Sequence, residues 1–139
     1  MPPLAPALPP RSAAFVTHVL PAVAYAGALF YGGLIRLGAL PEVGFMATDK
    51  LLHTLAFGGL ALLLARTVHF FRPAVTLAKK LALGAAGSSL LGLVLEVCQA
   101  FTRYRSADLW DWLADTVGAL LASALMFALL AWVPRRAHG

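Results

Sequence analysis

Four long apolar segments constrain the fold of this chain more than any other feature of its sequence. They cover about residues 13–35, 50–68, 81–101 and 109–133, and a membrane-spanning helix needs about 20 predominantly apolar residues. Only 12% of the residues are charged, where soluble domains carry roughly a quarter. Too few polar residues remain to coat a water-facing surface. We therefore predict an all-α integral membrane bundle of four transmembrane helices.

The rest of the chain adds little to this single domain. Residues 1–12 are rich in proline and lack helical periodicity, which predicts an extended N-terminal arm. The four-helix transmembrane domain covers residues 13–136, and residues 137–139 form a short tail. The first span is too long for the apolar part of a signal peptide, so we expect it to be retained. Pro21 lies inside this span and is expected to kink it, because proline has no amide donor.

The basic residues of the chain indicate how it is oriented. A net charge of +5 would suggest a nucleic-acid partner in a soluble protein, but here the bases lie at the ends of apolar runs, so we expect none. Seven bases and no acid fall on the side of the membrane that holds both termini, against four bases and several acids on the other side. The seven are Arg11, Arg66, Arg72, Lys79, Lys80, Arg135 and Arg136. Because basic segments stay in the cytoplasm, both termini are predicted to be cytoplasmic.

Polar residues recur near the outward end of the last three spans, at spacings of three or four that place them on one helix face. They are Asp49 and His53 in the second span, Glu96, Gln99 and Arg103 at the end of the third, and Asp108, Asp111 and Asp115 at the start of the fourth. A charge facing lipid costs at least about 2.5 kcal/mol at the helix centre. The three stripes are therefore expected to face one another around a cavity that opens to the outer side.

The same residues resemble the pattern of a known family. The order Asp49-Lys50-x-x-His53-x-x-x-Phe57, then Glu96-x-x-Gln99, then Arg105-x-x-Asp108-x-x-Asp111 and Gly118 is similar to that of the VanZ-like membrane proteins. That family takes its name from a protein linked to low-level teicoplanin resistance. The resemblance implies a bacterial envelope protein of the cytoplasmic (inner) membrane, with a tie to glycopeptide antibiotic resistance, and it supplies no reaction. Asp115 stands where the family usually has asparagine.

One functional hypothesis is a pocket that binds or acts on a lipid-linked or phosphate-bearing envelope precursor. Guanidinium groups suit phosphate oxygens, and His53 would act as an acid or base oriented by Asp49 or Glu96. The expected catalytic residues are His53, Glu96 and Asp111. The expected binding residues are Asp49, Lys50, Gln99, Arg103, Arg105, Asp108 and Asp115.

The sequence leaves other interpretations open. No cofactor is evident, but an imidazole with several carboxylates could hold a divalent cation such as magnesium, calcium or manganese. The alternative function is a non-catalytic accessory or assembly subunit of a larger membrane complex, in which the polar cluster only locks the helices together. Asp49 and Asp108 also fit as helix caps. Glu96 lies within an apolar run and needs a partner, for which the candidates are Arg103, Arg105, Lys50 and His53.

Overall fold

The computed structural model describes residues 13, 15–35, 45–103 and 107–132, and within them it shows four α-helices and no strand. The helices are α2 (Leu20–Leu34), α3 (Phe45–Phe71), α4 (Leu77–Ala100) and α5 (Leu109–Trp132), and a π-helical turn, η1 (Phe15–Val19), precedes α2. All four segments are long and apolar enough to cross a membrane. The predicted all-α bundle of four transmembrane helices is confirmed. The predicted arm and tail lie outside the described residues.

Two helices begin earlier than the apolar pattern indicated. α3 starts at Phe45 rather than near Lys50, and α4 starts at Leu77 rather than near Leu81. The start of α4 is set by Thr76, whose hydroxyl oxygen accepts a hydrogen bond from the Lys79 amide. Such a cap satisfies one of the amides that the first helical turn leaves free. Polar residues can therefore occupy the first turn of a spanning helix, where hydropathy alone does not find them.

Pro21 marks a change of helix type within the first span. It lies in the first turn of α2, directly after the π-helical turn η1. Proline has no amide donor, so Pro21 cannot continue the hydrogen-bond pattern of the π-helical turn before it. The disturbance expected from this proline thus takes the form of a π-to-α transition at Val19 and Leu20.

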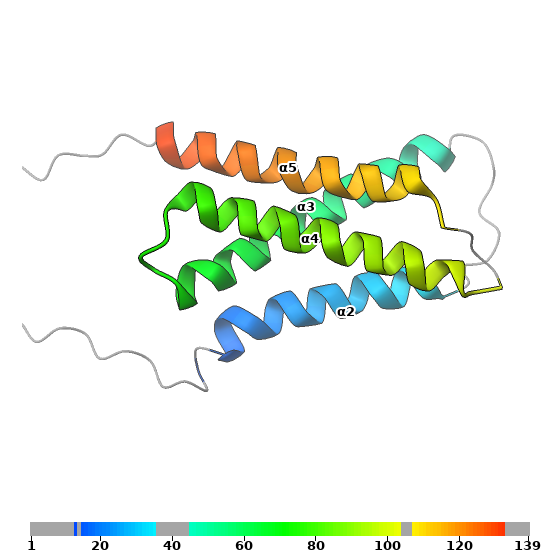
Figure 1. The fold of residues 1–139 in the computed structure, drawn as a ribbon, viewed down its shortest axis with the longest axis horizontal. Helices are drawn as coiled ribbons and strands as arrows, with labels where there is room; N and C mark the ends of the chain where they lie inside the picture. Colours follow the sequence, from blue (N-terminus) through cyan, green and yellow to red (C-terminus); the bar gives the residue numbers. More distant parts are fainter. Residues whose placement is uncertain (1–12, 14, 36–44, 104–106, 133–139) are drawn as a thin grey trace, which may run out of the picture.

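The helices run in alternating directions, and α3, α4 and α5 pack against one another while α2 lies along one side (Figure 1). α2 contacts α3 and α4, and no contact with α5 occurs in the described part of the chain. The core between α2, α3 and α4 is built on Phe57, Leu60 and Leu95, all nearly inaccessible. Because the bundle is thin, most other large apolar side chains face outward, as expected for helices in lipid.

α3 and α5 approach each other very closely at Gly118. A Cβ atom added there would overlap the Thr54 carbonyl oxygen and would lie 2.6 Å from the Thr54 carbonyl carbon. Only glycine permits this approach, as in other membrane helix pairs that pack through small residues. The close approach brings the start of α5 against the start of α3, which is where the polar residues of both helices lie.

Candidate functional site

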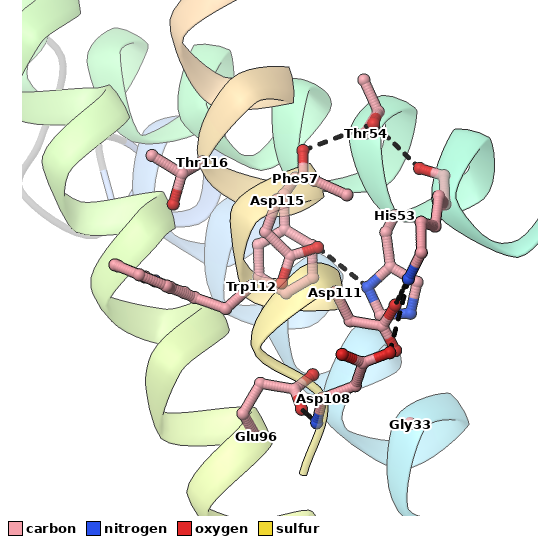
Figure 2. A network of polar contacts seen from close by, with 12 residues as sticks. Gly33, His53, Thr54, Phe57, Glu96, Asp108, Asp111, Trp112, Asp115 and Thr116 are labelled. Atoms are coloured by element: carbon pink, nitrogen blue, oxygen red, sulfur yellow. Dashed lines mark hydrogen bonds and ion pairs between the residues drawn. The ribbon is translucent and has the colours of Figure 1, made fainter.

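A histidine and a carboxylate meet between α3 and α5 (Figure 2). His53 Nδ1 lies 2.8 Å from Asp115 Oδ1, and Asp115 is fully buried while the His53 side chain is 12% exposed. Gly92 on α4 makes room for this carboxylate, because a Cβ atom there would lie 2.6 Å from Asp115 Oδ2. The expectation that Asp49 or Glu96 orients His53 was wrong, because the hydrogen bond of His53 Nδ1 is with Asp115 on α5.

The tautomer of His53 follows from this contact. An ionised carboxylate only accepts hydrogen bonds, so with Asp115 ionised the proton of a neutral ring is on Nδ1. Nε2 then keeps its lone pair and is the ring atom available to a cation or to a proton. A buried carboxylate that holds the other nitrogen in this way is the usual support of a metal-binding or basic histidine.

Lys50 is already engaged by acids of α5. Its Nζ donates to Asp111 Oδ1 at 2.7 Å and to Asp108 Oδ2 at 3.4 Å. The Asp111 side chain is 14% exposed, whereas those of Lys50 and Asp108 are about two-fifths exposed, at 39% and 43%. Lys50 therefore neutralises part of the acidic cluster and is not a free clamp for an anionic ligand.

Asp108 caps α5, as its position before the last span indicated. Its Oδ1 accepts a hydrogen bond from the Trp110 amide at 2.8 Å. That hydrogen bond, with a further contribution from the Lys50 ammonium, lowers the pKa of the Asp108 carboxyl below its ordinary value. Asp108 is thus an ionised helix cap at the mouth of the site.

The Glu96 side chain binds the same turn through the main-chain amide of Asp108. Its Oε2 accepts a hydrogen bond from the Asp108 amide at 2.8 Å, and the residue is 4% exposed (Figure 2). The expected pairing of Glu96 with Arg103, Lys50 or His53 is wrong for the described residues, and Arg105 lies outside them.

Two buried carboxylate oxygens, Glu96 Oε1 and Asp115 Oδ2, have no hydrogen-bond donor within the described part of the chain. Burying a polar atom without a partner costs free energy, on the order of 1–3 kcal/mol. The two oxygens lie at the same end of the bundle as His53, which identifies this end as a place where a proton, a polar ligand or a cation is stabilising.

Gln99 and Arg103 do not join the cluster. Gln99 is buried, and its Nε2 donates to the Gly33 carbonyl oxygen at 3.0 Å, so it ties α4 to α2. Arg103 is exposed and forms no hydrogen bond or ion pair with another described residue. Of the residues predicted to bind a ligand, these two form no hydrogen bond or ion pair with His53 or with the carboxylates among the described residues.

Three half-buried side chains have the geometry of a cation site. One ligand atom from each of Asp49, His53 and Asp111 lies within 4.8 Å of the other two. Two carboxylates and an imidazole form a donor set suited to divalent cations such as Mn²⁺, Mg²⁺ or Zn²⁺. The residues present therefore fit such an ion. Asp115 orients the histidine through the ring nitrogen that does not bind the ion, Nδ1.

An apolar cavity adjoins these ligands. It has a volume of about 230 Å³, lies between α2 and α3, and brings Asp49 and His53 together with Gly32, Leu52 and Phe57. Its walls are otherwise apolar, so it suits a hydrocarbon chain whose polar end meets the two ionisable residues.

Some contacts around the site could not be found from the sequence pattern. Trp112 donates from its indole nitrogen to the Ser89 carbonyl oxygen at 3.1 Å. Thr54 shares its hydroxyl between the carbonyl oxygens of Lys50 and Ala114. These hydrogen bonds link the three helices through backbone carbonyl acceptors, for which side-chain patterns give no signal.

The fold and this cluster define a transmembrane helical protein with an acidic, histidine-containing site at one end of its bundle. The sequence model of the VanZ/LLP1 family matches residues 14–131. The chain therefore belongs to the VanZ/LLP1 family, and the predicted VanZ-like relationship is confirmed. Neither the curated proteins nor the solved structures contain a match to it.

Proposed function

We propose that this protein binds a lipid-linked, phosphate-bearing precursor of the bacterial cell envelope, through a divalent cation held by Asp49, His53 and Asp111. The observation that carries the proposal is the meeting of these three ligand groups at the end of an apolar cavity. The site would lie on the outer side of the cytoplasmic membrane, where such precursors and glycopeptide antibiotics meet.

The charge balance explains why a cation is needed. Five carboxylates belong to this end of the described chain, against Lys50, His53 and the exposed Arg103. The carboxylates are Asp49, Glu96, Asp108, Asp111 and Asp115. A phosphate group would be repelled by such a field, whereas a bound divalent cation offsets part of the negative charge and offers the phosphate a positive charge to bind. This differs from the direct arginine and lysine clamp expected from sequence, since Lys50 is paired with Asp111 and Asp108 and Arg103 forms no ion pair with a described acid.

The adjoining cavity accounts for the lipid part of the ligand. His53 and Asp49 contribute to the wall of the cavity between α2 and α3 and also to the cation ligand set. A hydrocarbon chain in the cavity would therefore present its phosphate to the cation. Gly32 lines the same cavity, and a Cβ atom added there meets nothing within 4 Å, so the volume can be filled without disturbing the helices.

The residues around the ion have separate roles in this proposal. Asp115 orients His53 and fixes which ring nitrogen is free. Lys50 holds Asp111 from the solvent side. A divalent cation in this position would polarise a phosphoryl oxygen and lower the pKa of a bound water.

Orientation is supported by the charges at the other end of the bundle. Arg66, Arg72, Lys79 and Lys80 lie at the end of α3 and the start of α4, where the described residues include no acid. Bases of this kind remain cytoplasmic. The acidic site then faces the outer leaflet.

The cation is tested with purified protein in a neutral detergent. Mn²⁺ binding, followed by titration calorimetry and by the electron paramagnetic resonance of free Mn²⁺, should weaken at least about tenfold in Asp49→Asn and in Asp111→Asn. Asp108→Asn is the matched control, because it removes the same charge from the same cluster but no proposed ligand. Unchanged Mn²⁺ affinity in both ligand variants would contradict the proposal.

The lipid is tested separately with a polyprenyl phosphate added to the same preparation. Retention of the lipid should require Mn²⁺ or Mg²⁺ and should be abolished by a chelator. Gly32→Leu should lower lipid retention while leaving Mn²⁺ affinity unchanged, since it fills the cavity and touches no ligand. Lipid retention that ignores both the chelator and Gly32→Leu would show that the lipid binds elsewhere.

A second candidate function is that of a non-catalytic accessory subunit of a membrane complex. The observation that favours it is the Lys50 ion pair with Asp111 and Asp108, which joins α3 to α5 without any ligand. In that case the double variant Lys50→Asp with Asp111→Lys should restore the stability lost in each single variant, and Mn²⁺ should have no effect on stability.

A further inference from the structure

We propose a second ligand site at the opposite end of the bundle, where α3, α4 and α5 enclose a cavity suited to the phosphate of an anionic phospholipid. The cavity has a volume of about 270 Å³. Arg66 and His69 near the end of α3 and Lys80 near the start of α4 line it, and Leu62, Leu81 and Met126 contribute to its apolar wall. The site shares no residue with the acidic cluster and does not depend on the function proposed for it.

Lys80 is the centre of the argument. Only 6% of this residue is exposed, yet its Nζ has two neutral partners, the Pro73 carbonyl oxygen at 2.9 Å and His69 Nδ1 at 3.2 Å. An ammonium group has three N–H donors, so one remains for a ligand. Taking a charge out of water is costly unless an opposite charge compensates it. An anion bound next to Lys80 would therefore stabilise its buried ammonium group.

The contact with Lys80 also sets the role of His69. Because an ammonium group can only donate, His69 Nδ1 accepts, and the proton of the neutral ring is on Nε2. The ring thus has an N–H donor left over, and the exposed Arg66 lines the same cavity as His69. Three N–H-bearing side chains around one small volume match the several oxygens of a phosphate group.

The described part of the chain supplies no counter-charge at this end of the bundle. Every carboxylate of the described chain lies in the first turns of α3 and α5, just before α5, or in the last turns of α4, at the opposite end of the bundle (Figure 1). Among the described residues nothing offers that negative charge, so a ligand is left to supply it. A phosphate-bearing compound is the chemistry that fits both the donors and their number.

The walls distinguish a phospholipid from a free phosphate compound. Six of the nine residues that line the cavity are apolar, and four of these are on α4 and α5. Basic pockets between transmembrane helices at the cytoplasmic surface bind lipid head groups in this way. The volume is small enough for the phosphate and glycerol parts of a lipid, with the acyl chains lying outside along the helices.

The experiment is a lipid titration of the full chain, stripped of native lipid in a neutral detergent and followed by native mass spectrometry. Phosphatidylglycerol, phosphatidylcholine with the same acyl chains, and water-soluble glycerol phosphate are compared. The key variant is Lys80→Met, which keeps an apolar chain of similar length. Lys79→Met is the matched control, since Lys79 is the exposed neighbour on the same helix and loses the same charge.

Phosphatidylglycerol is expected to bind at least about tenfold more tightly than phosphatidylcholine. Both lipids carry the phosphate, but the choline ammonium of phosphatidylcholine would be repelled by Lys80 and Arg66. Lys80→Met should remove this preference and Lys79→Met should keep it. A preference that survives Lys80→Met, or that is lost equally in Lys79→Met, would overturn the site. Glycerol phosphate that binds as tightly as the lipid, with the same dependence on Lys80, would overturn the lipid assignment.

A second variant covers the case in which Lys80→Met does not fold, since Lys80 also binds the Pro73 carbonyl. Arg66→Gln changes an exposed side chain that lines the cavity, and Arg72→Gln changes an exposed arginine of the same end that does not. Only Arg66→Gln should weaken phosphatidylglycerol binding. Equal effects of the two substitutions would reduce the interaction to general surface charge and refute the pocket.

Discussion

Replacing Gly118 by alanine should separate α3 from α5 and disrupt the polar cluster at their ends. The added Cβ would stand 2.6 Å and 2.7 Å from two Thr54 backbone carbons, where ordinary contact begins at 3.4 Å. Relief therefore needs a backbone shift of about 1 Å, since neither partner is a flexible side chain. His53 adjoins Thr54 in the chain, and Asp115 lies one turn before Gly118. The same shift would therefore stretch the 2.8 Å contact between His53 and Asp115.

The size of the effect follows from three contributions. Overpacking of a tight helix contact costs about 1–3 kcal/mol, and losing a hydrogen bond to a charged group costs about 1.5–3 kcal/mol. Alanine returns up to about 1 kcal/mol through its higher helix propensity. The Gly118→Ala variant should therefore lose about 3 kcal/mol of unfolding free energy.

The assay is unfolding in mixed micelles, by titration from dodecyl maltoside into dodecyl sulfate, followed by circular dichroism. Gly27→Ala in α2 is the matched control, because a Cβ atom there meets nothing within 4 Å, and its stability should stay the same or rise slightly. If Gly118→Ala proved as stable as Gly27→Ala, the close approach of α3 and α5, and the site built on it, would be refuted.

Two further predictions concern the charged residues at the mouth of the site. Asp111→Asn should cost only about 0.5–1 kcal/mol in the same assay, because its ion pair with Lys50 is partly exposed; a larger loss would mean a more enclosed pair. Asp108 has a pKa below its ordinary 3.8, chiefly through the Trp110 amide and then through Lys50. Its stabilisation is present above about pH 4 and is lost as the pH falls through the lowered folded-state pKa. Unfolding measured from about pH 5 downward should therefore show a smaller loss for Asp108→Asn than for the wild type, and equal losses would assign the acid sensitivity to other groups.

Hydropathy and helical spacing were enough to predict the four spanning helices and the faces that carry polar residues. The cost of exposing charges to hydrocarbon further predicts that these faces turn inward. Spacing does not fix the rotation and depth of one helix relative to its neighbour. In this chain they depend on the contact of Gly118 with the Thr54 backbone, which decides that His53 meets Asp115 and not Glu96.

Two other features of the structure were not predicted from the sequence, for different reasons. The partner of Glu96 is the backbone amide of Asp108, and every non-proline residue carries such a donor, so no sequence pattern reveals it. Lys80 was assigned to the flank of a span because α4 was expected to begin near Leu81. The cap at Thr76 was visible in the sequence as a threonine before an apolar run, and it would have placed Lys80 in the first turn of the helix.

The most direct test of the account is the protonation and bonding of the His53 ring in the intact protein. NMR of ¹⁵N-histidine-labelled protein in lipid nanodiscs, with His53→Gln to assign the signal, reports which ring nitrogen carries the proton. The structure implies a proton on Nδ1, whose signal is shifted downfield by hydrogen bonding and protected from exchange with water. In Asp115→Ala this downfield shift and this protection should both be lost. A His53 ring with its proton on Nε2, or one whose signals ignore Asp115→Ala, would contradict the convergence of α3 and α5 on a common buried site.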